Sequence, residues 1–196
     1  QSPSNKGYSA GNNWGIKIAL GRNADYVTLL NNDTIVEPVF LEPLVEFAEK
    51  DEKIGAVGPK IVGVDGKVDP VCARGRLTFW NYCYVWNKIR RCFMRFEELQ
   101  FRRGYYYKDY KFDSPKRVDT LSGACMMFKR STFEKVGFLD ENVFLMLEEL
   151  ILTEKFRKVG LLSYIVPKSV ILHKGSGTIG KEPSRKIKKI IRRSRD

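Results

Sequence analysis

The run Asp25-Tyr26-Val27-Thr28-Leu29-Leu30-Asn31-Asn32-Asp33-Thr34 carries the clearest fold signal in the chain. Residues 26–30 are a short apolar run with the composition typical of a strand, and polar residues follow at once. The pattern predicts a buried strand that ends just before the carboxylate of Asp33. Open α/β sheets bind ligands beyond the carboxyl ends of their strands, so Asp33 is a candidate binding residue. The alternative is an Asx turn that simply closes the strand.

Segments on either side alternate between helical and strand patterns. Periodicity predicts a helix through Ile16–Leu20 and another over 39–50, followed by a strand over 54–64. Further elements are expected at these positions: a strand over 118–128, a short helix capped by Ser131 and ending near Gly137, a helix over 144–159, and strands over 162–166 and 170–172, the first stopped by Pro167. This alternation predicts an α/β fold with a mostly parallel sheet flanked by helices.

Bulk composition limits the class of protein. A chain of 196 residues with 43% hydrophobic content has enough apolar residues for one globular core and is not largely disordered. No apolar run approaches the roughly 20 residues of a membrane span, and no secretory signal opens the chain, so we expect a cytoplasmic protein. The spacing of the cysteines matches no zinc pattern and favours free thiols, with disulfides in a secreted protein as the alternative.

Two segments concentrate the net charge of +12. Residues 69–117 are rich in aromatic and basic residues, among them Trp80 and Trp86, and a helix is expected around 86–101. Aromatic rings stack on sugars and arginines bind phosphates, so this segment is interpreted as an insertion that recognises a sugar or phosphate ligand, or alternatively as an aromatic core with solvated arginines. The basic tail, 181–196, has an isoleucine stripe that suits an anionic membrane surface, and a solvated tail is the alternative.

Several other residues have side chains or backbones suited to a site. Glu148 and Glu149 begin a predicted helix; adjacent helical residues point in different directions, so one acid can act while the other anchors. Their alternative role is to stabilise the positive end of the helix dipole. His173, the single histidine, is a possible metal ligand or a structural residue. Gly123 and Ala124 allow a ligand close to the backbone, or else serve tight sheet packing.

In their order and spacing, four blocks of sequence resemble family 2 glycosyltransferases with the GT-A fold. Within that family the chain is most similar to the bacterial branch that includes rhamnosyltransferase-like enzymes of cell-surface polysaccharide synthesis. The resemblance is carried by these segments: Asn5–Ile16; Asp25–Thr34 with Pro38 and Phe40; Leu121–Arg130 with Val136–Glu141; and Phe144–Glu149 followed by Gly160, Tyr164, Pro167 and His173.

This resemblance implies a role for each matching residue. Asp33 and His173 would hold Mn²⁺ or Mg²⁺ against the donor diphosphate, and Glu149 would be the catalytic base, with Glu148 as the neighbouring candidate. The remaining implied assignments are donor binding by Asn5, Gly7, Asn12, Asn13, Asn31 and Asn32, and a sugar and acceptor cleft at Gly123 and Ala124. The resemblance does not cover the insertion at 69–117; its aromatic residues, among them Trp80 and Trp86, are interpreted from their chemistry as acceptor-recognition residues that extend this cleft.

The chain also departs from the family pattern. Ile151 stands where the family often has a second aspartate, and the base is one methylene longer than the usual aspartate. The family usually begins with a strand-helix-strand unit that grips the nucleotide base, whereas this sequence starts after it. We therefore expect a truncated GT-A domain over 1–180 with weakened donor binding.

The implied function is an inverting transfer of a sugar, rhamnose among the candidates, from a nucleoside-diphosphate donor to a saccharide or lipid-linked acceptor. Such a reaction needs a general base for the acceptor hydroxyl and a Lewis acid for the departing diphosphate. The implied location is cytoplasmic, with contact at the inner face of the membrane as an open alternative. Two rival readings are a basic nucleic-acid-binding module, although no recognition motif supports nucleic acid as a partner, and an inactive carbohydrate-binding remnant.

Overall fold

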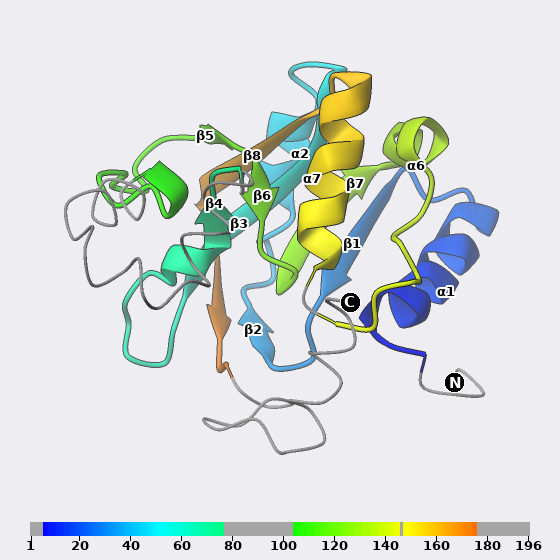
Figure 1. Cartoon of the computed structure of the whole chain (residues 1–196). Helices are drawn as coiled ribbons and strands as arrows, with labels where there is room; N and C mark the ends of the chain where they lie inside the picture. The colour runs from blue at the N-terminus through cyan, green and yellow to red at the C-terminus, as the bar shows by residue number, and fades with distance from the viewer. Residues whose placement is uncertain (1–5, 77–103, 146, 176–196) are drawn as a thin grey trace, which may run out of the picture.

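The computed structural model describes residues 6–76, 104–145 and 147–175 (Figure 1). Several expectations lie outside these residues: donor binding by Asn5, the aromatic residues Trp80 and Trp86, the helix around 86–101, and the basic tail 181–196. Within the described part, no helix has both the length and the apolar composition needed to cross a bilayer.

A six-stranded sheet forms the centre of the molecule, with the order β1-β7-β3-β8-β2 and with β5 paired to β8. The strands have these bounds: β1 Tyr26–Leu30, β2 Thr34–Val36, β3 Ile54–Val62, β5 Lys116–Val118, β7 Cys125–Lys129 and β8 Leu162–His173. The predicted strand at 26–30 is confirmed residue for residue, because its apolar run is bounded by polar residues on both sides.

The α/β class is confirmed, but the expectation of a mostly parallel sheet is wrong. In the described part, β3 and β8 pair in parallel, whereas the other ladders of this sheet, β1–β7, β3–β7, β2–β8 and β5–β8, are antiparallel. Strand β7 is inserted between β1 and β3 and runs against both. Alternation of helix and strand along the sequence does not reveal such an insertion, because strand direction is decided by pairing between distant segments.

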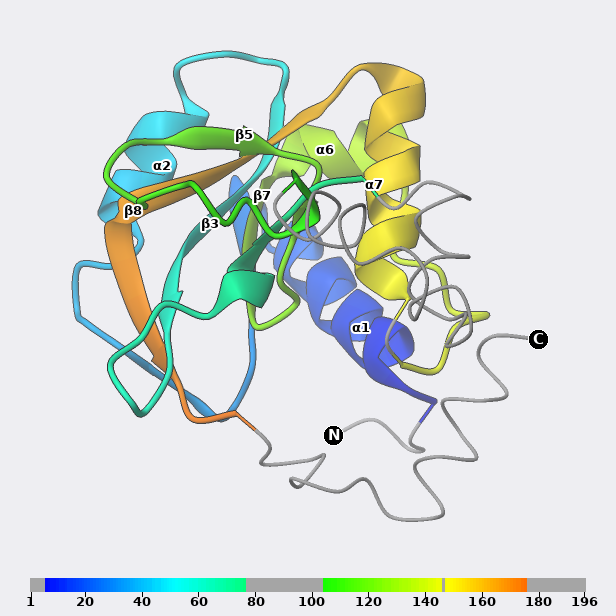
Figure 2. The same ribbon diagram turned by 60° about the vertical axis from the view of Figure 1, so that its left-hand side comes forward.

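Helices cover both faces of this sheet (Figures 1 and 2). They are α1 Tyr8–Gly21, α2 Glu42–Ala48, α6 Arg130–Val136 and α7 Glu148–Val159. Successive strand residues point to opposite faces. Met126 and Phe128 accordingly join the cluster that contains residues of α1, α6 and α7, whereas Met127 joins the cluster beneath α2. The result is a three-layer arrangement of helices, sheet and helix.

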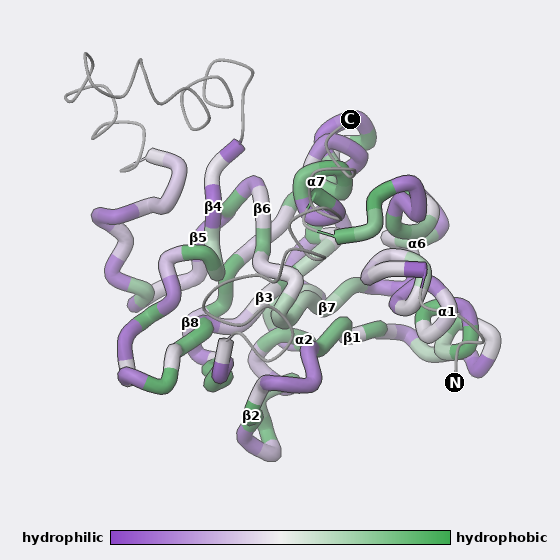
Figure 3. The backbone as a smooth tube through the Cα atoms, turned by 60° about the horizontal axis from the view of Figure 1, so that its bottom comes forward, coloured by the Kyte–Doolittle hydropathy of each residue, from purple (hydrophilic) through white to green (hydrophobic). Residues whose placement is uncertain are grey.

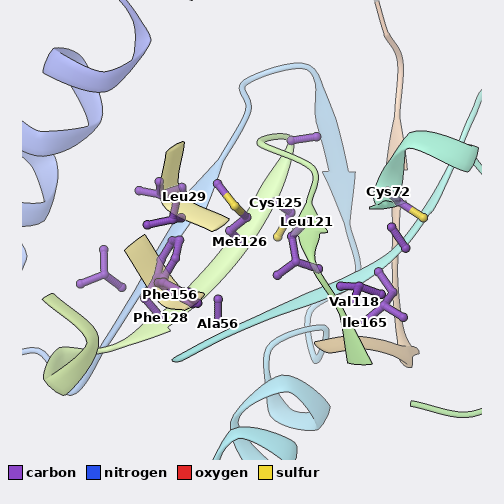
Figure 4. Close-up of a cluster of buried hydrophobic side chains, with 14 of the residues drawn as sticks. Leu29, Ala56, Cys72, Val118, Leu121, Cys125, Met126, Phe128, Phe156 and Ile165 are labelled. Carbon is purple, nitrogen blue, oxygen red and sulfur yellow. The ribbon is translucent and has the colours of Figure 1, made fainter. Parts of the chain in front are cut away.

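The larger cluster forms the main hydrophobic core, and Figure 4 shows part of it between β1, β7 and α7. Hydrophobic residues run through the central strands, while hydrophilic residues are frequent on the outer helices and turns (Figure 3). Cys72 and Cys125 are buried free thiols, as expected for two of the four cysteines. Burial raises the pKa of Cys72 to about 11 and that of Cys125 to about 12, so both stay protonated at neutral pH.

Three expected boundaries differ from the structure. The short helix α6 is capped at Lys129 and not at Ser131, which lies inside the helix, although it does end at Gly137 as predicted. Helix α7 begins at Glu148 instead of Phe144. Pro167 does not stop a strand, because β8 continues through it to His173 with a register shift opposite Pro59 and Lys60. Such an irregularity lets a strand accommodate a proline, which has no N–H for the ladder.

The segment 69–117 is anchored to the fold at both of its ends. After the short 3₁₀ helix η1 Pro70–Cys72, strand β4 Ala73–Arg74 pairs with β6 Thr120–Leu121 in a second, two-stranded sheet. At the other end, β5 joins the edge of β8 in the central sheet. The described ends of the predicted insertion are therefore integral parts of the α/β fold.

Candidate active site

Asp33 and His173 meet where β2 joins the end of β8. Thr34, the first residue of β2, lies opposite His173, and the N–H of Lys174 donates to the carbonyl of Asp33 at 2.9 Å. This register brings His173 Nε2 to 3.1 Å from Asp33 Oδ1. The two side chains are 20% and 19% exposed, so both remain accessible to a ligand from solvent.

The donor set of this pair fits a divalent metal that also binds a phosphate. A carboxylate oxygen and an imidazole nitrogen are ligands that manganese accepts, and magnesium often uses one or two carboxylates together with substrate phosphates. Across the described residues, no group of three or more histidine, cysteine, aspartate or glutamate side chains could enclose a metal. Within the described residues, a metal at Asp33 and His173 would therefore need ligands other than a third side chain of these four types, such as substrate phosphates or water.

Glu149 forms the second part of the site, in the first turn of α7. Its Oε1 accepts a hydrogen bond from the N–H of Gly123 at 2.9 Å, and a guanidinium nitrogen of Arg74 lies 3.5 Å from the same oxygen. The Glu149 side chain is 17% exposed. Glu148 is almost fully buried, and its Oε2 accepts from the N–H of Leu147. The two adjacent acids thus have different surroundings, and Glu149 is the one open to solvent.

Tyr8 supports the loop that contacts Glu149. Its hydroxyl donates to the carbonyl of Gly123 at 2.7 Å. Burial, with smaller contributions from the carboxylates of Glu149 and Glu148, raises the pKa of Tyr8 far above its usual range. The phenol therefore stays protonated and can serve as a donor at neutral pH. A Cβ at position 123 would lie 3.0 Å from Glu149 Oε1 and 3.2 Å from the Tyr8 hydroxyl, so glycine lets both groups approach.

A short backbone connection joins the Asp33 pair to the Glu149 group. The N–H of Asn31 donates to the carbonyl of Ala124 at 3.0 Å, and Ala124 directly follows Gly123. In Figures 1 and 2, the end of β8 and the start of α7 lie toward the same end of the sheet. A surface depression lined by Tyr26 and Lys129 lies at the other end of β1. That depression contains neither the carboxylate–histidine pair nor Glu149.

The first block of sequence packs against the third and fourth blocks. Gly7 has a φ of +98°, and the next N–H, that of Tyr8, donates to the carbonyl of Phe144 at 3.0 Å. The Asn12 side chain donates to the carbonyl of Tyr8. Asn13 is 1% exposed, and its amide bonds to both the N–H and the carbonyl of Leu139. The buried Asn13 amide thus joins α1 to the backbone of Leu139, and Asn13 is not among the residues proposed to contact the donor.

Asn31 and Asn32 border the metal-ligand candidates. Among the described residues neither side chain makes a hydrogen bond, and Asn32 is exposed. Sequence reasoning did not single out two residues of the candidate site, Arg74 and Tyr8. Arg74 lies in a segment with many arginines, and no local sequence signal distinguishes it from the others. Tyr8 belongs to the predicted donor block, but its hydrogen bond to Gly123 spans 115 positions of sequence and depends on the fold.

The mixed sheet with helices on both faces has the GT-A fold. A solved structure with the same fold is that of GalNAc-T7 with UDP, GalNAc and Mn²⁺: the TM-score is 0.55 at 18% identity, over 88% of this chain and 31% of that chain. The chain belongs to glycosyl transferase family 2, whose model matches residues 1–137. The resemblance seen in the sequence is thereby confirmed.

Two curated relatives show where in the family this chain lies. The N-acetylglucosaminyl-diphospho-decaprenol L-rhamnosyltransferase of Mycobacterium tuberculosis is 29% identical over 171 residues, which cover 82% of this chain and 50% of that protein. The low-salt glycan biosynthesis hexosyltransferase Agl10 of Haloferax volcanii is 26% identical, over 76% of this chain and 42% of that protein. The chain spans half or less of the length of these relatives.

Proposed function

We propose that this chain transfers a sugar from a nucleoside-diphosphate donor to a saccharide or lipid-linked acceptor, with inversion at the anomeric carbon. The observation that carries the proposal is the pair of functional groups joined through Gly123, Ala124 and Asn31: a carboxylate–histidine pair at the end of β8 and the Glu149 carboxylate at the start of α7. The Asp33–His173 pair suits a metal ion that binds a diphosphate, and the Glu149 carboxylate suits the role of general base.

Asp33 and His173 are the residues proposed to hold Mn²⁺ or Mg²⁺. When bound, the metal would supply a positive charge that stabilises the leaving nucleoside diphosphate. The distance of 3.1 Å between Asp33 Oδ1 and His173 Nε2 supports this assignment, because two such donors can turn toward one cation. The exposed side chain of Asn32 beside them is a proposed hydrogen-bond donor to the nucleotide.

Glu149 is proposed to be the general base. The acceptor hydroxyl attacks the anomeric carbon, its proton passes to the Glu149 carboxylate, and the bond from that carbon to the diphosphate breaks. Partial exposure supports this role, because an acceptor must reach the carboxylate from solvent. Glu148 is buried and bonded to the helix start, which suits an anchor for α7.

The substrate class is proposed from the relatives. The mycobacterial relative is named as a rhamnosyltransferase that acts on a lipid diphosphate sugar, and the archaeal relative as a hexosyltransferase. We therefore propose rhamnose or another hexose as the donor sugar and a polyprenyl-diphosphate-linked sugar as one acceptor. Such an acceptor would bring the protein to the cytoplasmic face of a membrane, where the basic residues of 181–196 suit anionic lipids.

Binding and transfer measurements test the two assignments separately. Calorimetry with UDP, GDP and dTDP should show binding that strengthens with Mn²⁺, and Asp33→Asn should remove the metal-dependent part. Glu149→Gln should keep this binding and lower kcat by roughly 10²–10⁴-fold, the usual contribution of a general base. Glu46→Gln, a surface acid on α2, is the matched control and should change neither. Equal diphosphate binding by wild type and Asp33→Asn would refute the metal assignment, and transfer by Glu149→Gln within about threefold of wild type would refute the base.

A further inference from the structure

Arg74 enters the candidate site from the described start of the basic aromatic segment 69–117. Its backbone is held on two sides. In the two-stranded sheet it lies opposite Thr120, and its carbonyl accepts from the N–H of Asp119 at 3.1 Å. The next residue, Gly75, donates to the carbonyl of Tyr105 at 2.7 Å. Arg74 is therefore fixed between β6 and the returning end of the same segment.

The guanidinium of Arg74 has little access to water. The side chain is 12% exposed, and one terminal nitrogen lies 3.5 Å from Glu149 Oε1 and 3.3 Å from the carbonyl oxygen of Leu121. The Nε atom is buried and has no hydrogen-bond partner among the described residues. A buried charge is costly unless an opposite charge compensates it, so the Glu149 carboxylate is the group that stabilises Arg74 here.

The contacts on Glu149 are asymmetric. Both the N–H of Gly123 and the guanidinium of Arg74 approach Oε1. In the part of the chain that the structure describes, Oε2 takes part in no hydrogen bond or ion pair. An oxygen that already accepts from two donors is fixed in place, whereas the other oxygen of the same carboxylate stays available to accept a proton.

We propose that Arg74 is a positioning residue for the base: it holds Glu149 Oε1 together with Gly123 and so turns Oε2 toward the acceptor. This inference rests on the proposed function. In the transfer step, the acceptor oxygen forms the new bond to the anomeric carbon and its proton goes to Oε2. The electron pair of the broken carbon–oxygen bond leaves with the nucleoside diphosphate. Arg74 itself exchanges no proton in this step, because an arginine stays charged throughout.

A kinetic comparison separates positioning from simple stabilisation. Arg74→Met keeps the aliphatic volume and removes the charge. Displacement of a catalytic group by about 1 Å costs on the order of 100-fold in rate, so kcat should fall roughly 10- to 100-fold while the acceptor KM stays within about threefold. Arg74→Lys should recover part of the loss. The control is Arg76→Ala, which removes an exposed arginine paired with Glu154 and should leave kcat unchanged.

A double variant shows whether the two residues act as a unit. If Arg74 works through Glu149, then adding Arg74→Met to Glu149→Gln should lower kcat by less than about twofold more. A double variant that loses the product of the two single effects would overturn the proposal, and so would an Arg74→Met protein with wild-type kcat.

A second measurement does not depend on turnover. The Gly123 amide proton reports its bond to Glu149 Oε1, so in a spectrum of glycine-labelled protein its resonance should move when Glu149 is changed to glutamine. Arg74→Met should move the same resonance in the same direction, and Arg76→Ala should leave it in place. If Glu149→Gln moves the resonance and Arg74→Met does not, the positioning role is refuted. If the wild-type protein performs no transfer but both variants move the resonance, the proposed function fails while the contact of Arg74 with Glu149 stands.

Discussion

The substitution Gly123→Ala tests the packing on which the candidate site depends. The alanine methyl would lie 3.0 Å from Glu149 Oε1 and 3.2 Å from the hydroxyl of Tyr8, so both groups would have to retreat by a few tenths of an ångström. Position 123 has no positive φ, and the backbone itself accepts an alanine. In the folded state, the effect of the substitution therefore comes from crowding and not from backbone strain.

The size of the effect follows from two opposing contributions. Overpacking of a well-filled site costs about 1–3 kcal/mol, and the stiffer unfolded chain of an alanine variant returns about 0.4–1 kcal/mol. The net change is a destabilisation between about 0 and 2.6 kcal/mol, with a central value of about 1.3 kcal/mol. For a chain of 196 residues the central value lowers the melting temperature by about 3–5 °C. Because the retreat also lengthens the bond from Gly123 to Glu149, now 2.9 Å, kcat should fall as well.

Thermal unfolding followed by circular dichroism measures this prediction. The matched control is Gly15→Ala in α1, where an added methyl meets nothing within 4 Å. A helical glycine replaced by alanine should stabilise the protein by about 0.5–1 kcal/mol. If Gly123→Ala raised the melting temperature as Gly15→Ala does, the close approach of Tyr8 and Glu149 to position 123 would be wrong.

Two further predictions concern the start of α1 and the surface of α7. In Gly7→Ala, an alanine would have to adopt a φ of +98° with its Cβ against the carbonyl oxygen of Phe144. Urea denaturation should therefore show that the free energy of unfolding falls by roughly 2–5 kcal/mol. A decrease below about 1 kcal/mol would contradict this backbone contact. Hydrogen bonds from Arg157 and Arg76 lower the pKa of Glu154 below its ordinary value of 4.5, so its contribution to stability is present above that value and lost as the pH falls through the lower folded pKa. Glu154→Gln should therefore flatten the acid side of the stability profile, and an unchanged profile would show that these surface pairs contribute nothing measurable.

Local pattern was sufficient where a segment's own residues decide its state. The apolar run of β1 is bounded by polar residues, and its predicted limits are those observed. The end of α6 at Gly137, with a φ of +71°, was also predictable, because glycine adopts this conformation at low cost. The same holds for Asp33, whose place after a buried strand follows from the order of residues alone.

Other features depended on contacts between distant segments. The register of β2 with β8 brings His173 to Asp33 across 140 positions of sequence, and no local pattern reports that distance. Pro167 predicted a strand end, but parallel pairing with β3 on both sides of a register shift carries β8 through it. The hydrogen bonds between β8 and β3 on either side of Pro167 keep the strand continuous, although the proline has no N–H to donate.

The sequence by itself therefore determined the α/β class, most element positions, and the blocks of residues by which the chain resembles glycosyl transferase family 2. The tertiary structure decided the direction of β7, the burial of Glu148 and Asn13, and the arrival of Arg74 beside Glu149. The physical reason is range. Hydrophobic periodicity and turn residues act within a few positions, whereas strand pairing and charge compensation join groups that are neighbours only after the chain has folded.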